Sequence, residues 1–161
     1  AKKDVLITLY KSDSFDKNGN ENELVLMDQL PANRKNLIKS SVIDLNKQKY
    51  KKYLCCRCVK NNTESVIELR CDKRDFVQSD RKRSKFVKQY IGLNIKCRNV
   101  NVGFLNIEFL NNRVFQNDSE AEEYIESTLV TYQHLIQYQF IKRIFFKDLS
   151  LKCRTQEELQ E

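Results

Sequence analysis

The chain of 161 residues has little of what nucleotide-binding loops need: three glycines, one proline and no tryptophan. Because glycine occurs only at positions 19, 92 and 103, neither a dinucleotide-binding fingerprint nor a P-loop can be formed. No apolar run reaches the roughly 18 residues that a membrane-spanning helix needs. The sequence therefore predicts neither a nucleotide cofactor nor a membrane partner.

Catalytic patterns are also scarce. The only histidine is His134, and no serine or cysteine stands at motif spacing beside it. Glu68 in V-I-E-L-R, with Asp44 as a distant carboxylate, resembles part of a metal-dependent nuclease motif. Strand alternation explains Glu68 equally well as an outward residue between two apolar ones. We predict no catalytic residues, no cofactor and no enzymatic activity.

The six cysteines leave three interpretations open: a zinc site, a disulfide framework or reduced thiols. They include no C-x-x-C pair, which disfavours zinc, so no metal site is expected. A chain of this length has little need of disulfide bonds, although the even count permits them. We favour reduced thiols that serve as small core residues on strands. The cysteines are Cys55, Cys56, Cys58, Cys71, Cys97 and Cys153.

Positive charge is concentrated in the middle of the chain. Residues 47–98 hold sixteen Lys/Arg and five Asp/Glu, a net charge of +11, whereas residues 1–46 are neutral and residues 99–161 carry −4. A basic segment of this kind is typical of a chain that meets phosphate, although it is also found on solvated faces.

Tyrosines stand among these cations, a combination that holds single-stranded nucleic acid by base stacking and phosphate contacts. Tyr53 is equally well explained as a core residue. The candidate nucleic-acid-binding residues are Tyr50, Lys51, Lys52, Tyr53, Arg57, Arg81, Lys82, Arg83 and Lys85.

Apolar and β-branched runs predict strands in the first part of the chain. Val5–Tyr10 and Glu23–Asp28 are strand candidates. Between them and the basic segment, either a helix begins at Pro31 or a strand covers Ser41–Leu45.

The basic segment predicts a hairpin followed by a helix. Lys49–Lys60 and Glu64–Asp72 would pair across Asn61–Thr63. A short helix over Ser79–Ile91 would then end at Gly92. A second hairpin follows, with strands Leu93–Asn101 and Val102–Phe115.

The strongest prediction is a long helix after the capping box Ser119–Glu122. Its apolar residues recur at helical spacing but extend beyond one face. We therefore expect it to pack on the domain along one edge and on a partner along another, the alternative being complete burial in its own core. The candidate partner-binding residues are Ile125, Leu129, Tyr132, Leu135, Ile136 and Phe140.

This order of elements predicts a mainly β fold with α, an OB-fold-like five-stranded barrel with a long C-terminal helix. We expect a single domain over residues 1–161. It would comprise N-terminal strands and a short helix (1–46), the barrel core (47–116) and the partner-binding helix (118–147).

The run Gly92–Leu110, followed by a capped helix, resembles the end of the small OB-fold subunits of the CST telomere complex, which are similar to the smallest subunit of replication protein A. The resemblance implies a non-enzymatic, nuclear subunit of a heteromeric telomerase-associated complex that binds single-stranded DNA. It also implies that the last helix docks on another OB-fold subunit and that contact with nucleic acid is direct or through the complex. Two alternatives stay open, a stand-alone RNA- or DNA-binding domain and a disulfide-bonded secreted or viral effector.

Overall fold

A computed structural model describes residues 5–12, 23–30, 42–71, 86–97 and 99–143 of the chain. Six strands form one sheet in the order β3-β2-β1-β6-β5-β4, and every neighbouring pair is antiparallel. The strands are β1 (Val5–Ser12), β2 (Glu23–Leu30), β3 (Val42–Asp44), β4 (Ser65–Glu68), β5 (Val87–Cys97) and β6 (Val100–Leu110).

The sheet is open, so the prediction of a five-stranded OB barrel is wrong. Its two edges, β3 and β4, are only three and four residues long, and short edge strands discourage pairing with other chains. Residues 47–116 also do not form a separate barrel core. One of their two longest strands, β6, pairs over Gly103–Phe109 with β1 from the first 46 residues.

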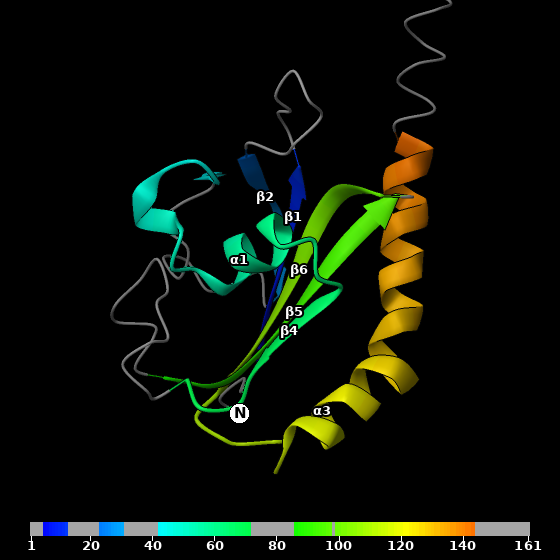
Figure 1. The fold of residues 1–161 in the computed structure, drawn as a ribbon. Helices are drawn as coiled ribbons and strands as arrows, with labels where there is room; N and C mark the ends of the chain where they lie inside the picture. The colour runs from blue at the N-terminus through cyan, green and yellow to red at the C-terminus, as the bar shows by residue number, and fades with distance from the viewer. Residues whose placement is uncertain (1–4, 13–22, 31–41, 72–85, 98, 144–161) are drawn as a thin grey trace, which may run out of the picture.

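Helices cover the sheet on both faces (Figure 1). On one face lies the short helix α1 (Leu54–Lys60), preceded by the 3-10 turn η1 (Gln48–Tyr50). On the other face lies the C-terminal helix, which begins as α3 (Asp118–Tyr124), continues through the π-helical segment η2 (Ile125–Leu129) and stays helical over 130–143. The result is a three-layer arrangement of helix, sheet and helix (Figure 1).

Strand alternation divides the core between these two layers. The residues that face the C-terminal helix are aliphatic or aromatic, and they include Ile91, Leu93, Ile95, Leu105, Ile107 and Phe109. The residues that face α1 are mixed, because Tyr10 and Phe104 share that face with buried polar groups and with the cysteines of α1.

The predicted hairpin over residues 49–72 is wrong in its first half. Residues 54–60 form α1, and β4 pairs with β5. Leu54, Cys55, Cys58 and Val59 are all buried, and their spacing is that of one helical face. That spacing was the signal for a helix, whereas Tyr50, Tyr53 and Val59, residues common in strands, favoured a strand.

The predicted helix over Ser79–Ile91 is also wrong where the structure describes it, since residues 87–91 begin β5. A short apolar run does not by itself distinguish a strand from a buried helix. Gly92 lies within β5, where a Cβ would come 2.7 Å from the ring of Phe104. Glycine is thus needed there for close packing and not as a helix stop.

Several other predicted elements are confirmed. Strands occur at Val5–Ser12, Glu23–Leu30 and Val42–Asp44. β5 and β6 form a second hairpin as predicted, but its turn lies before Val100 and not after Asn101. The possible helix after Pro31 lies outside the described residues. In the described part of the chain, no helix combines the length and apolar character that crossing a membrane requires.

Candidate functional site

The C-terminal helix begins two residues earlier than the predicted capping box. Asn117 is the N-cap, and its side-chain oxygen accepts a hydrogen bond from the Glu120 amide at 2.9 Å. The Glu120 carboxylate accepts in turn from the Gln116 amide at 2.7 Å. These two bonds satisfy amide groups that a helix start leaves free.

The helix then changes direction at η2, and Figure 1 shows the turn between its first part and its ascending second part. A π-helical segment adds a residue to one turn and commonly accompanies a bend. Ile125 and Leu129, at its two ends, are both buried against the sheet.

The C-terminal helix also lies close to the sheet near its described end, around Phe140. Phe140 is 8% exposed and packs over Gly103 of β6. A Cβ at Gly103 would come 2.7 Å from the Phe140 ring and 2.5 Å from the Tyr10 carbonyl oxygen. Glycine at this position therefore lets the helix approach the sheet.

The outer side of the same helix is apolar and exposed. Tyr132, Leu135 and Tyr138 are 57%, 57% and 61% exposed. Beside them a groove of about 440 Å³ runs between the helix and strands β1 and β2. Its apolar lining comes from Leu9, Met27, Leu135, Ile136 and Phe140. We call Tyr132, Leu135 and Tyr138, together with this groove, the outer apolar face.

The structure therefore divides the six predicted partner-binding residues. Ile125, Leu129 and Phe140 belong to the chain's own core. Tyr132 and Leu135 are exposed, and Ile136 is half-buried between the two groups. The stripe is thus not wholly buried in the chain's own core, and contact of its exposed part with a partner stays a prediction.

Charge is separated along the helix. Glu120, Glu122, Glu123 and Glu126 are exposed near its start, and Lys142 and Arg143 are exposed at its described end. Acidic groups near a helix N-terminus and basic groups near a C-terminus interact favourably with the helix dipole.

The opposite layer holds a cluster of thiols. Cys55, Cys56 and Cys58 lie on α1, all are free and buried, and the Cys55 and Cys56 sulfurs are 4.0 Å apart. The hydrogen bond to Cys56, followed by burial, raises the pKa of Cys55 well above its ordinary value. Burial also raises the pKa of Cys58. These groups are therefore held as thiols and not as reactive thiolates.

Beneath α1 the central strands contribute a buried polar network. The Tyr90 hydroxyl donates to the Asn106 side-chain oxygen, and the Asn106 amide donates to the Thr8 hydroxyl at 3.0 Å. Glu108, next in the same row of β6, is 2% exposed. Burial raises the pKa of Tyr90 well above its ordinary value, with Cys55 and Glu108 adding to the effect.

The predicted nucleic-acid-binding residues are only partly brought together. The Tyr50 ring is buried and packs edge-on against Tyr53, with ring centroids 5.2 Å apart, so it is not available for base stacking. Lys51, Lys52 and Arg57 are exposed around α1. Arg81, Lys82, Arg83 and Lys85 lie outside the described residues.

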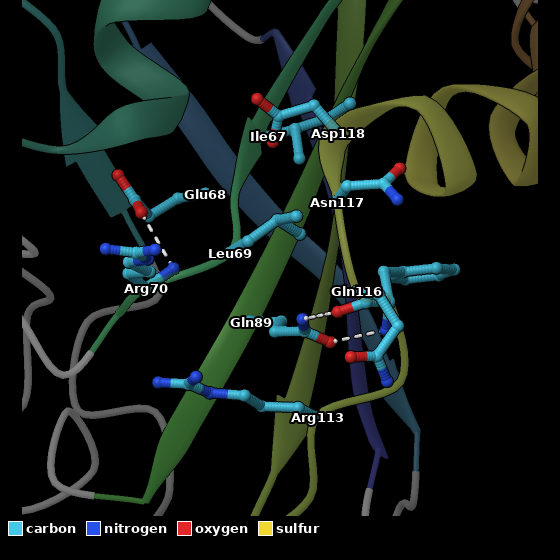
Figure 2. Close-up of a pocket in the computed structure, with 10 residues that line it drawn as sticks. Ile67, Glu68, Leu69, Arg70, Gln89, Arg113, Gln116, Asn117 and Asp118 are labelled. Atoms are coloured by element: carbon cyan, nitrogen blue, oxygen red, sulfur yellow. Dashed lines mark hydrogen bonds between the residues drawn. The ribbon is translucent and has the colours of Figure 1, made fainter.

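A polar cleft of about 530 Å³ lies at the start of the C-terminal helix (Figure 2). Its walls come from the end of β4, from β5 and from the loop between β6 and α3. No sequence signal predicted this cleft, because the three contributing segments are distant in the chain. Across the described residues, no group of three or more His, Cys, Asp or Glu side chains could hold a metal ion.

The sequence matches no family model and no curated protein. Solved structures do resemble this fold. The GAF domain of an Acinetobacter phosphoenolpyruvate-protein phosphotransferase is 18% identical, with a TM-score of 0.57, over 91% of this chain and 76% of that one. Residues 122 to 287 of a methyl-accepting chemotaxis protein are 15% identical, with a TM-score of 0.57, over 86% of this chain and 78% of that one.

Enzymes share the same architecture. The type II free methionine-R-sulfoxide reductase from Thermoplasma acidophilum is 15% identical, with a TM-score of 0.55, over 84% of this chain and 79% of that one. The fold is therefore GAF-like, an open antiparallel sheet with helices. The fold accommodates both enzymes and non-enzymatic sensor domains, so the activity of this chain must be argued from its own residues.

These likenesses correct the expectation drawn from the sequence. The run Gly92–Leu110 is the central hairpin of a GAF-like sheet and not the end of an OB barrel. The resemblance to CST telomere subunits, and the telomeric DNA-binding role that it implied, are thus wrong. A strand pair followed by a capped helix occurs in both folds, which differ in the number and order of their strands and in whether the sheet closes.

Proposed function

We propose that this chain is a non-catalytic GAF-like domain that associates with a second copy of itself through the outer apolar face of its C-terminal helix. The observation that carries the proposal is the exposure of Tyr132, Leu135 and Tyr138, each more than half exposed beside an apolar groove. Contiguous exposed apolar surface of this kind is typical of protein–protein contacts.

The spacing of these residues favours a second copy as the occupant. Tyr132 and Tyr138 stand three residues on either side of Leu135. An antiparallel pair of helices centred on Leu135 would place each Tyr132 opposite the partner's Tyr138. Such a contact is self-complementary, as a two-fold symmetric interface requires.

Charge supports the same antiparallel arrangement. Arg143, eight residues after Leu135, would lie level with Ser127 of the second copy, eight residues before its Leu135. Glu126, which lies within η2, is next to that position. The basic end of each helix would thus meet the acidic end of the other, which favours this orientation.

Sedimentation equilibrium over a range of protein concentrations tests the proposal. The wild-type chain should approach twice its monomer mass, and Leu135→Glu should remain monomeric with unchanged secondary structure. Raising the salt concentration should weaken association, because salt screens the attraction between exposed charges. The screening length is about 8 to 10 Å near physiological ionic strength.

His134→Glu is the matched control. His134 is also exposed, but it lines a different groove on the β4–β5 side of the helix. This variant should associate as the wild type does. A wild-type chain that stays monomeric at high concentration, or equal loss of association in both variants, would refute the proposed interface.

A thiol-dependent reductase is the second candidate, favoured by three free thiols within one turn of α1 in a fold that free methionine-R-sulfoxide reductases also have. The buried positions of all three thiols, and the raised pKa values of Cys55 and Cys58, argue against it. We expect no reduction of free methionine-R-sulfoxide in the presence of a thiol reductant. If the wild-type chain reduces free methionine-R-sulfoxide and Cys58→Ser abolishes that activity, the chain is a reductase and not a non-catalytic domain.

A further inference from the structure

The edge of the sheet at β4 is an interaction surface separate from the outer apolar face. β4 is the last strand in the order β3-β2-β1-β6-β5-β4, and among the described strands it pairs only with β5 (Figure 1). An edge strand presents main-chain N–H and C=O groups on its free side, and these groups can pair with another extended chain.

The pairing of β4 with β5 identifies the groups on the free side. The Asn94 amide donates to the Glu64 carbonyl oxygen at 2.9 Å, so these two residues form a hydrogen-bonded pair. Such pairs alternate along antiparallel strands, so residues two and four positions after Glu64 also direct their main-chain groups at β5. Ser65 and Ile67 direct theirs outward. Within the part of the chain that the structure describes, no residue bonds to these outward groups.

Clefts lie at both ends of the β4 edge, on the side of the C-terminal helix. One, of about 480 Å³, lies between Ser65 at the start of β4 and the helix around Glu126 and His134. The other is the polar cleft of Figure 2, which is lined by Ile67 and Leu69 at the end of β4. Ile67 and Leu69 are only partly buried against the apolar cluster beneath the helix. An extended chain along β4 would therefore find space for its side chains as well as partners for its main chain.

We propose that the β4 edge binds a short extended segment of another protein, which adds to the six-stranded sheet as a further strand. The N–H and C=O groups of Ser65 and Ile67 offer four main-chain hydrogen bonds to it. Every second side chain of the segment would face the C-terminal helix, with an apolar residue beside Ile67 and polar residues beside the two clefts. An edge of four residues is short for pairing between whole sheets, but it matches a segment of this length.

A second copy of the chain fits this edge less well. If Ser65 of one copy paired with Ile67 of the other in antiparallel orientation, Glu64 of each copy would lie opposite Glu68 of the other. Like charges directly opposite each other in a sheet are destabilising. Lys96 pairs with Glu64 at 2.8 Å but offsets its charge only in part, because the Glu64 side chain is 76% exposed. A segment without acidic residues at these positions avoids the repulsion.

Selection from a phage-displayed library of random octapeptides on the full chain tests the proposal. Enriched peptides should alternate apolar and polar residues, and each is then synthesised with a methyl group on one main-chain nitrogen at a time. Methylation at every second position should weaken binding about tenfold, because it removes a main-chain hydrogen bond, and methylation at the intervening positions should have a smaller effect. Failure to enrich any peptide, or equal effects at successive positions, would overturn the proposal.

Ser65→Pro tests whether the peptides bind at β4. This variant removes one outward N–H group, and proline is tolerated at the first position of an edge strand. It should bind the peptides about tenfold more weakly than Ser65→Ala, which keeps the N–H group and also has a small side chain. Circular dichroism of both variants verifies that the fold is retained. Equal binding by the two variants would place the peptides elsewhere and refute the assignment to β4.

Sedimentation equilibrium of Leu135→Glu distinguishes a peptide from a second copy as the occupant of the edge. This variant should be monomeric, because its outer apolar face is disrupted, and it leaves β4 intact. If it still dimerises and the added Ser65→Pro substitution abolishes that dimer, a second copy occupies the β4 edge and the peptide proposal is wrong.

Discussion

The two faces of the sheet are built from the same strands but differ in chemistry. On β6, Leu105, Ile107 and Phe109 face the long C-terminal helix, whereas Asn106 and Glu108 face the short helix α1. The first face is held mainly by apolar burial, with a hydrogen bond from the Gln133 side-chain amide to the Asn94 carbonyl oxygen at 2.7 Å. The second combines apolar contacts with a buried hydrogen-bond network and free thiols. Stability should therefore respond differently to substitutions only one residue apart.

The largest expected effect comes from an adjacent pair, Ile107→Ala and Asn106→Ala. The first should lower the free energy of unfolding by about 2–5 kcal/mol, because it leaves a cavity beneath the helix. The second should lower it by about 1–3 kcal/mol, since the Tyr90 and Thr8 hydroxyls lose their partner. Urea denaturation measures both. A larger loss from Asn106→Ala would mean that the polar network, and not apolar packing, dominates the stability of the sheet.

An intermediate effect is expected where the C-terminal helix meets β6. Gly103→Ala should destabilise the fold by about 1–3 kcal/mol, because the added methyl group would clash with the Tyr10 carbonyl and the Phe140 ring. Gly103→Ala combined with Phe140→Leu should recover part of the loss, since the smaller side chain leaves room. Thermal unfolding of the single and double variants measures this coupling. Purely additive losses would contradict the close contact between the helix and Gly103.

The smallest effect concerns pH and is confined to the α1 face. The pKa of Cys55 is raised from an ordinary value of 9.0 and that of Tyr90 from 10.0. Above these ordinary values the unfolded chain loses protons that the folded chain retains. The free energy of unfolding should thus be constant near neutral pH and fall as the pH rises above about 9.

Cys55→Ala tests the origin of that alkaline decline. Removing the thiol should reduce the loss of stability between pH 7 and pH 10, when each protein is compared with itself by urea denaturation at the two values. Cys97→Ala is the control, because Cys97 is only half-buried at the end of β5. An equal decline in all three proteins would show that Cys55 does not titrate differently in the folded chain.

The sequence predicted elements best where local signals were strong. β1 and β2 carry apolar and β-branched runs, and the C-terminal helix carries both a long periodic stripe and a cap within two residues of the observed one. It failed at α1, where four buried residues at helical spacing were outweighed by residues of high β-propensity. It failed again at Val87–Ile91, a run too short to separate a buried strand from a helix.

The candidate surfaces were predictable to different degrees. The wide stripe of the last helix predicted an outward apolar side, and Tyr132 and Leu135 are indeed exposed. The inward positions of Ile125, Leu129 and Phe140 depend on the bend at η2 and on the close approach at Gly103, for which the sequence has no local signal. The polar cleft could not be predicted at all, because β4, β5 and the loop before α3 meet only in the folded chain.

The sequence by itself determined the alternation that gives the central strands one apolar and one mixed face, and the amphipathic character of the last helix. Tertiary structure alone decided the order of the strands. β1 lies between β2 and β6, although β6 is almost a hundred positions away from β1 in the chain. The pairing of β1 with β6 is part of an open GAF-like sheet, whereas a closed barrel was expected. Strands in both folds alternate buried and exposed side chains with a period of two residues. This alternation specifies which side chains are buried, but it does not specify which strands are neighbours. The packing of the whole chain determines that.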